Sequence, residues 1–147
     1  MKKLVSFALC VMMLCAAALP AGAAPSDDQN ISVTVSEDGR LEIITVLETE
    51  NSLLRASMPA YKTSYVKYDG KLIAEVTLSA TFGYDGDEAW VVEAEGDSVT
   101  YDGWRYGSEE IEDSGGTVSL SAELSKAAER TLDVDISMTC SPSGTIR

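Results

Sequence analysis

The side chains that could do acid–base chemistry in this chain are carboxylates, because the sequence contains no histidine. Without an imidazole, the Ser-His-Asp and Cys-His arrangements and imidazole metal sites are excluded. A glycoside hydrolase needs instead two carboxylates placed across a cleft. Because the chain has 24 acidic residues, neighbouring acids arise by chance. We therefore expect no enzyme, with a carboxylate-based glycoside hydrolase as a remote alternative. The candidate pairs are Asp87 and Glu88, Glu93 and Glu95, Glu109 and Glu110, and Glu112 and Asp113.

A cation site is the second candidate, in the segment Asp85-Gly86-Asp87-Glu88. Three carboxylates surround a glycine turn there, and calcium takes about six to eight oxygen ligands. Asp97 or Asp102 could approach from neighbouring loops, although the spacing is not that of an EF-hand loop. Asp85, Asp87 and Glu88 therefore predict either a calcium-dependent extracellular module or a hairpin turn with solvated acids. No other cofactor is expected.

The aromatic residues supply the third candidate. Trp104 and Tyr106 flank Arg105 just after an Asp-Gly turn, so the three could form a binding patch at a loop tip. Surface Trp and Tyr provide rigid contact area for protein or glycan partners. The alternative, which we favour, is that Trp90 and Tyr101 fill the core while the other aromatic residues cover sheet edges.

The N-terminus has the features of an export signal. Met1-Lys2-Lys3 is basic, residues 4–19 are apolar and uncharged, and Pro20-Ala21-Gly22-Ala23 ends in small residues. We expect cleavage between Ala23 and Ala24, which divides the chain into a signal peptide (1–23), a flexible leader (24–30) and one domain (31–147). The protein would then be secreted, with no transmembrane segment in the mature chain. A lipid anchor is disfavoured, because leucine precedes both Cys10 and Cys15.

Removal of the signal changes the charge and the cysteine content. Without Lys2 and Lys3, nine basic and 24 acidic side chains remain, a net charge of −15. This charge argues against nucleic acid and anionic membranes as partners and favours a soluble monomer. Cys140 remains as the single cysteine, predicted to be a buried small hydrophobe, with an intermolecular disulfide as the alternative.

The elements that must position these residues are strands. Apolar residues alternate with polar ones, most clearly from Leu72 to Phe82, and Asp-Gly pairs mark the turns. Gly96-Asp97 is read as a further turn. A helix over 119–130 competes with a hairpin, which we favour because residues 118–124 alternate at every position. About eight or nine strands indicate an all-β, antiparallel, Ig-like β-sandwich, with a barrel as the alternative.

Three short motifs add a resemblance: Ala80-Thr81-Phe82-Gly83-Tyr84-Asp85-Gly86, Gly103-Trp104, and Met138-Thr139-Cys140-Ser141-Pro142-Ser143-Gly144-Thr145. Over roughly residues 62–147 the chain resembles small exported proteins of Gram-positive bacteria that belong to families of unknown function. The resemblance implies export and an all-β domain, and it implies no catalytic residue. Similar sequences often carry a second cysteine near Val91 and Val92, which this chain lacks. The combined expectation is a secreted, non-enzymatic binding domain with an extracellular protein or glycan partner.

Overall fold

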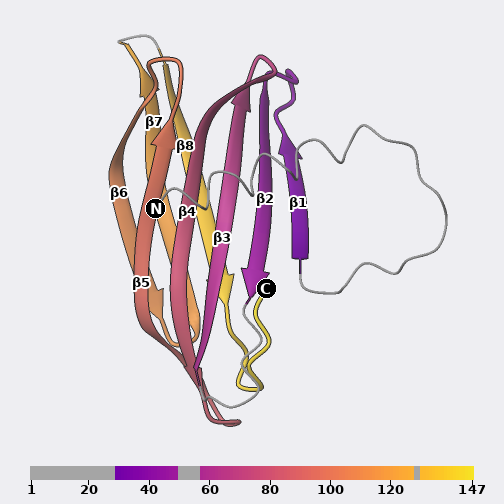
Figure 1. Cartoon of the computed structure of the whole chain (residues 1–147), viewed down its shortest axis with the longest axis vertical. Helices are drawn as coiled ribbons and strands as arrows, with labels where there is room; N and C mark the ends of the chain where they lie inside the picture. Colours follow the sequence, from indigo (N-terminus) through magenta and orange to yellow (C-terminus); the bar gives the residue numbers. More distant parts are fainter. Residues whose placement is uncertain (1–28, 50–56, 128–129) are drawn as a thin grey trace, which may run out of the picture.

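The computed structural model describes residues 29–49, 57–127 and 130–147, which form eight antiparallel strands in two sheets (Figure 1). Strands follow one another in sequence order within each sheet. The five-stranded sheet contains β1 (Gln29–Val35), β2 (Leu41–Thr49), β3 (Ser57–Tyr68), β4 (Lys71–Tyr84) and β5 (Ala89–Thr100). The three-stranded sheet contains β6 (Arg105–Ser114), β7 (Thr117–Lys126) and β8 (Arg130–Thr139).

The two sheets form a sandwich, which confirms the predicted fold class. β8 packs against β3, β7 packs against β4 and β5, and β6 runs beside β5. The strands form two separate sheets, so the alternative of a closed barrel is wrong. Each sheet is a meander among the described residues, and neither has the Greek-key crossover that characterises immunoglobulin domains, so the Ig-like part of the prediction is wrong.

The core lies between alternating residues of β4, β7 and β8. Leu78 and Phe82 of β4 are fully buried, as are Leu120 and Leu124 of β7 and Met138 of β8. Each of these side chains stabilises the fold by about 1.5–3 kcal/mol through burial. The strand predicted from Leu72 to Phe82 and the hairpin predicted after residue 118 are confirmed. Cys140 is also buried, with 3% of its surface exposed, as predicted for a small hydrophobe.

A bulge in β5 overturns the prediction that Trp90 fills the core. The pairing of β4 with β5 shifts between Thr81 and Phe82, so Phe82 faces Val91 while Thr81 faces Glu93. The extra residue exchanges the two faces of the strand's first part. Trp90 therefore lies outside, 40% exposed. Its ring covers the backbone of Gly83, where an added Cβ would lie 2.4 Å from the indole.

The predicted turn at Gly96-Asp97 is also wrong, because β5 runs without interruption through both residues. A Cβ on Gly96 would lie 2.3 Å from Glu109 Oε2 and 2.8 Å from Leu120 Cδ1. The lack of a side chain at Gly96 thus lets the second sheet pack closely against β5, and the chain does not turn there.

β1 begins at Gln29, inside the segment expected to be a flexible leader. Its side chains from Asn30 to Val35 are exposed, and those of Ile31, Val33 and Val35 are 53%, 56% and 56% exposed. The apolar side of this strand therefore faces outward and takes no part in the core.

The predicted signal peptide and its cleavage site at Ala23 and Ala24 lie outside the described residues. In the described part of the chain, no helix is long and apolar enough to cross a membrane.

Candidate functional site: a cationic end

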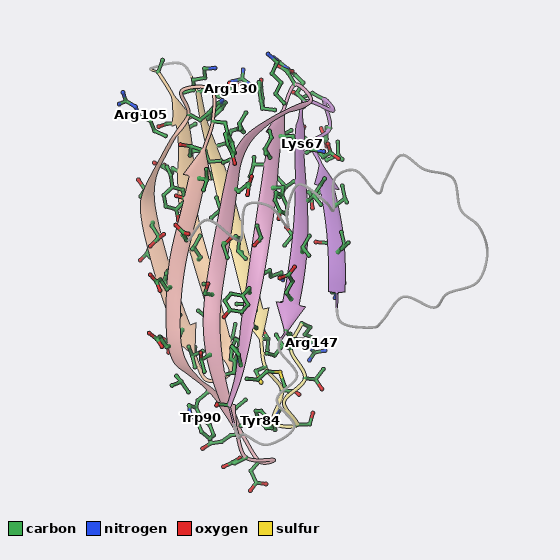
Figure 2. All side chains as sticks on the ribbon, in the orientation of Figure 1. Lys67, Tyr84, Trp90, Arg105, Arg130 and Arg147 are labelled. Atoms are coloured by element: carbon green, nitrogen blue, oxygen red, sulfur yellow. The ribbon has the colours of Figure 1, made fainter. Side chains whose placement is uncertain are left out.

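Four turns meet at one end of the sandwich, because a meander of antiparallel strands returns to the same end after every second strand. They join β1 to β2, β3 to β4, β5 to β6, and β7 to β8. We call this part the cationic end and define it as the described residues in 34–42, 67–72, 99–106 and 125–131. Figure 2 shows Lys67, Arg105 and Arg130 at this end, while Tyr84, Trp90 and Arg147 lie at the opposite end.

The charges of the molecule are distributed unequally between this end and the rest. Six of the eight described basic residues lie at the cationic end, together with only five of the twenty described acids. The remainder of the described chain carries fifteen acids against Lys62 and Arg147. The strong negative charge therefore belongs to the body of the sandwich. The six basic residues are Arg40, Lys67, Lys71, Arg105, Lys126 and Arg130.

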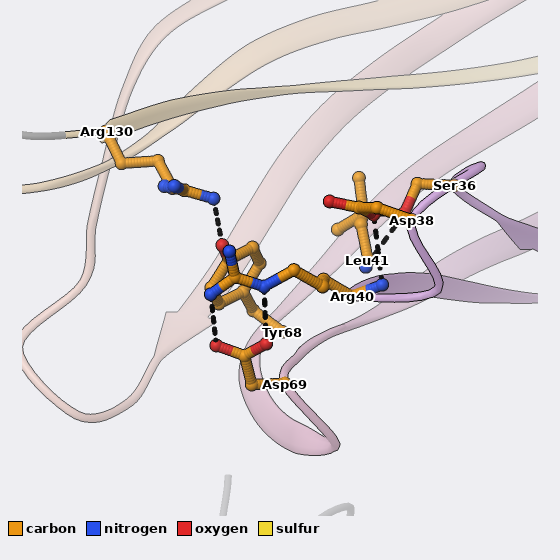
Figure 3. A network of polar contacts seen from close by, with 7 residues as sticks. All are labelled: Ser36, Asp38, Arg40, Leu41, Tyr68, Asp69 and Arg130. Atoms are coloured by element: carbon orange, nitrogen blue, oxygen red, sulfur yellow. Dashed lines mark hydrogen bonds and ion pairs between the residues drawn. The ribbon is translucent and has the colours of Figure 1, made fainter.

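Tyr68 organises two of these arginines (Figure 3). The guanidinium carbons of Arg40 and Arg130 lie 5.1 and 4.8 Å from the centre of its ring, within the range of cation–π attraction. Arg130 also donates a hydrogen bond to the Tyr68 hydroxyl. Behind Tyr68, the ring of Trp104 lies 6.0 Å away, centre to centre. The core thus supports a surface tyrosine that holds two cationic groups.

Arg40 is already occupied by a carboxylate. Its Nε and Nη2 donate to the two oxygens of Asp69 at 2.8 and 2.9 Å, a bidentate geometry. The Arg40 hydrogen bond holds the pKa of Asp69 below its ordinary value. Lys67 pairs with Glu42 at 3.3 Å. Arg40 and Lys67 therefore serve mainly to fix the turns.

The other four cations form no ion pair with any described acid: Lys71, Arg105, Lys126 and Arg130. Arg105 and Lys126 also line an open hollow together with Gly103, Ser125 and Ala127. A guanidinium binds carboxylates, sulfates and phosphates through parallel hydrogen bonds, and an ammonium binds them as a point charge. The cationic end is thus equipped to receive acidic groups of a partner.

The predicted patch of Trp104, Arg105 and Tyr106 is only partly at the surface. Trp104 is 6% exposed and belongs to the core, so the prediction that it forms a surface contact is wrong. Tyr106 is half-buried, and its hydroxyl donates to Glu109 Oε2 at 2.5 Å. Burial, reinforced by this hydrogen bond, raises the pKa of Tyr106 well above its ordinary value. Arg105 alone is exposed and contributes to the cationic end.

Tyr101 is the other aromatic residue placed wrongly in the predicted core. It is 37% exposed, and its hydroxyl donates to Glu75 Oε1 at 2.7 Å on the outer face of the first sheet. This hydrogen bond, more than burial, raises the pKa of Tyr101 to about 12.

The turn predicted as a calcium site lies at the end opposite the cationic end. One oxygen of Asp85 accepts hydrogen bonds from the backbone N–H groups of Asp87 and Glu88, both at 2.9 Å. These bonds lower the pKa of Asp85. The described residues contain no group of three acids placed to hold a metal ion, so Asp85, Asp87 and Glu88 are not gathered into a metal site. Their arrangement is that of a hairpin turn.

The acids considered for hydrolysis are all exposed. Neighbouring residues of a strand point to opposite faces, so Glu112 and Asp113 of β6 do not face one another across a cleft. Glu109 is held by Tyr106 and lies over Gly96. Glu93 and Glu95 of β5 share one face, opposite Thr81 and Ser79 of β4.

Comparisons with protein-family models, with curated proteins and with solved structures gave no match for this chain. The resemblance to exported proteins of Gram-positive bacteria therefore remains a prediction.

Proposed function

We propose that this protein is a secreted, non-enzymatic binding module that holds an acidic extracellular protein or glycan at its cationic end. The observation that carries the proposal is the concentration of six of the eight described basic residues on four adjacent turns of an otherwise acidic chain. Solubility alone gives no reason for this polarity, because scattered cations would leave the net charge unchanged.

The negative body does not prevent such binding. β4 has 14 residues, which corresponds to a sandwich about 46 Å long at about 3.3 Å per residue. The Debye length at physiological ionic strength is about 8 Å, so acids at the far end are screened from a partner at the cationic end. The acids of the body would instead orient the approach, since a negatively charged partner is repelled everywhere except at this end.

The rigid support of the end also favours binding. One two-residue turn joins β3 to β4, with Asp69 and Gly70 both at positive φ (50° and 74°), as in hairpin turns of type I′. Tyr68 restrains Arg130, which reduces the conformational entropy that an arginine loses when it engages a partner.

The proposal is tested with the exported protein and two acidic probes, dextran sulfate for a glycan and a polyglutamate peptide for a protein. Binding is measured at low and at physiological salt, with neutral dextran as the reference. We expect Lys126→Glu to weaken binding about tenfold, since it removes one charged contact and adds a repulsive one. The probe that binds more tightly identifies the class of partner.

Arg147→Glu is the matched control, because it makes the same change in net charge at the opposite end. It should leave the affinity nearly unchanged. Equal losses from both variants would show that net charge, and not the cationic end, governs binding, and absence of binding to both probes would overturn the proposal.

A further inference from the structure

The edge of β1 is an interaction surface separate from the cationic end. β2 is the only described strand hydrogen-bonded to β1, and β1 lies at the margin of the five-stranded sheet (Figure 1). From Asn30 to Val35 the strand contains no charge, no proline and no bulge. These are the devices by which proteins normally prevent edge-to-edge pairing.

The second sheet shows the protection that β1 lacks. In β8, the carbonyl oxygen of Ser137 accepts a hydrogen bond from the Lys62 ammonium at 2.7 Å. Thr139, at the end of β8, exchanges two backbone hydrogen bonds with Arg147. β6 has a register shift between Gly107 and Glu110 and a row of acids from Glu109 to Asp113. In an acidic chain, an uncharged strand on an open edge is a site where another strand can add.

The backbone groups of β1 that no described strand pairs belong to its apolar residues. Ser36 N–H donates to Leu41 O at 2.9 Å, which shows that the even-numbered residues of β1 are the ones hydrogen-bonded to β2. Partners alternate along an antiparallel pair, so Ser32 and Thr34 direct their N–H and C=O groups toward β2. Those of Ile31, Val33 and Val35 point away from the sheet. Their side chains also share the outer face, beside Val46 and Ile44 of β2.

We infer that the protein forms a symmetric dimer in which the β1 strands of two copies pair antiparallel, centred on Val33. This register places Val33 opposite its symmetry mate and Ile31 opposite Val35 of the other copy, so each facing pair exchanges two backbone hydrogen bonds. The apolar side chains of both strands then lie together on one face of a continuous ten-stranded sheet.

The charge distribution favours a second copy as the occupant. β1 starts beside Glu48 and ends beside Glu42, near Arg40 of the cationic end. Antiparallel pairing centred on Val33 therefore sets the cationic end of each copy beside the acidic body of the other, near Gln29 and Glu48, which orients the two unequal charge distributions favourably. The dimer would present its two cationic ends in opposite directions, a geometry suited to bridging two partners.

The test uses the full chain, exported from a bacterial host, with its N-terminus read by mass spectrometry. Sedimentation velocity from micromolar to several hundred micromolar protein should show the sedimenting species change from monomer to dimer. Val33→Lys puts two like charges opposite each other and should weaken association at least about tenfold. Val99→Lys is the matched control, a valine on the outer face of β5 that is 49% exposed, and should associate like the wild type.

Charge exchange makes the register itself testable. Val33→Glu should also be monomeric. An equal mixture of Val33→Lys and Val33→Glu should form the dimer again, because residue 33 of one copy faces residue 33 of the other and the two charges are then opposite. A single copy at every wild-type concentration would overturn the inference. A dimer that survives Val33→Lys would do the same.

Amide hydrogen exchange of the wild type provides a readout that needs no variant. Exchange at Ile31, Val33 and Val35 should slow as concentration rises, whereas Ser32 and Thr34 bond β2 in either state and should not change. Protection of all five amides in a single copy at every concentration would mean that another part of the same chain covers the edge, and would refute the dimer.

Discussion

Replacement of Trp104 by alanine tests whether this residue belongs to the core, as the structure shows, or to a surface patch, as the sequence suggested. The indole is 6% exposed, and its ring packs against Tyr68 at 6.0 Å. Truncation of a buried tryptophan costs about 3–5 kcal/mol, a large share of the roughly 5–15 kcal/mol that stabilises a typical domain. At this chain length the melting temperature should fall by about 10–20 °C. Binding of an acidic probe should fall only as far as the folded fraction falls.

Trp90→Ala is the internal control, because Trp90 is 40% exposed and covers Gly83 on the outer face. It should cost only about 1–2 kcal/mol. Urea denaturation followed by circular dichroism measures both variants, and the dependence of unfolding free energy on urea should remain the same. The two single-tryptophan proteins, Trp90→Phe and Trp104→Phe, provide a second measurement. Acrylamide should quench Trp90 strongly and Trp104 weakly. Equal destabilisation, or equal quenching, would refute the placement of Trp104 in the core.

Three further perturbations follow from the fold. Gly96→Ala should destabilise the protein by about 1–3 kcal/mol because its Cβ meets the second sheet, while Gly107→Ala, with open space at the Cβ, should have a much smaller effect; equal effects in thermal melts would contradict the close approach at Gly96. The pKa of Tyr101 is raised from 10.0 to about 12, so the stability from its hydrogen bond to Glu75 is present below pH 10 and lost as pH rises toward 12. Alkaline melts of Tyr101→Phe should therefore show a weaker pH dependence over this interval than those of the wild type, and an unchanged dependence would count against the assignment. Asp85→Ala should lower the melting temperature by a few degrees through loss of the turn, and excess calcium should leave both proteins unchanged; a calcium-induced rise that needs Asp85 would restore the calcium site.

Side-chain alternation was sufficient to predict the sandwich, because a half-buried strand must place its apolar residues at every second position. The pattern in β4 and β7 shows this clearly, and the Asp-Gly turns at Asp69 and Asp102 fell where positive φ angles occur. Alternation could not identify which side of each strand faces the core. In β5 one extra residue exchanged the faces, so Trp90 lies outside. Trp104, expected at a loop tip, is buried against Tyr68 instead.

The cationic end shows the same limit for the site. Arg105 was named from its neighbours in the sequence, whereas Arg40, Lys126 and Arg130 lie far from it along the chain. The net charge of the chain does not tell where these residues lie in space, and no local motif connects them. The one available signal was that basic residues recur beside the four segments that the structure shows as the turns of the cationic end.

By itself, the sequence determined the all-β class, the acidic charge, the lack of imidazole chemistry and the expectation of export. All of these follow from composition and from local periodicity. The tertiary structure decided which turns meet, which tryptophan is buried and which described strands lie at the margins of the sheets. Those properties depend on strand order, a bulge and the packing of one sheet on the other, since residues distant in the chain become neighbours only when the sheets form.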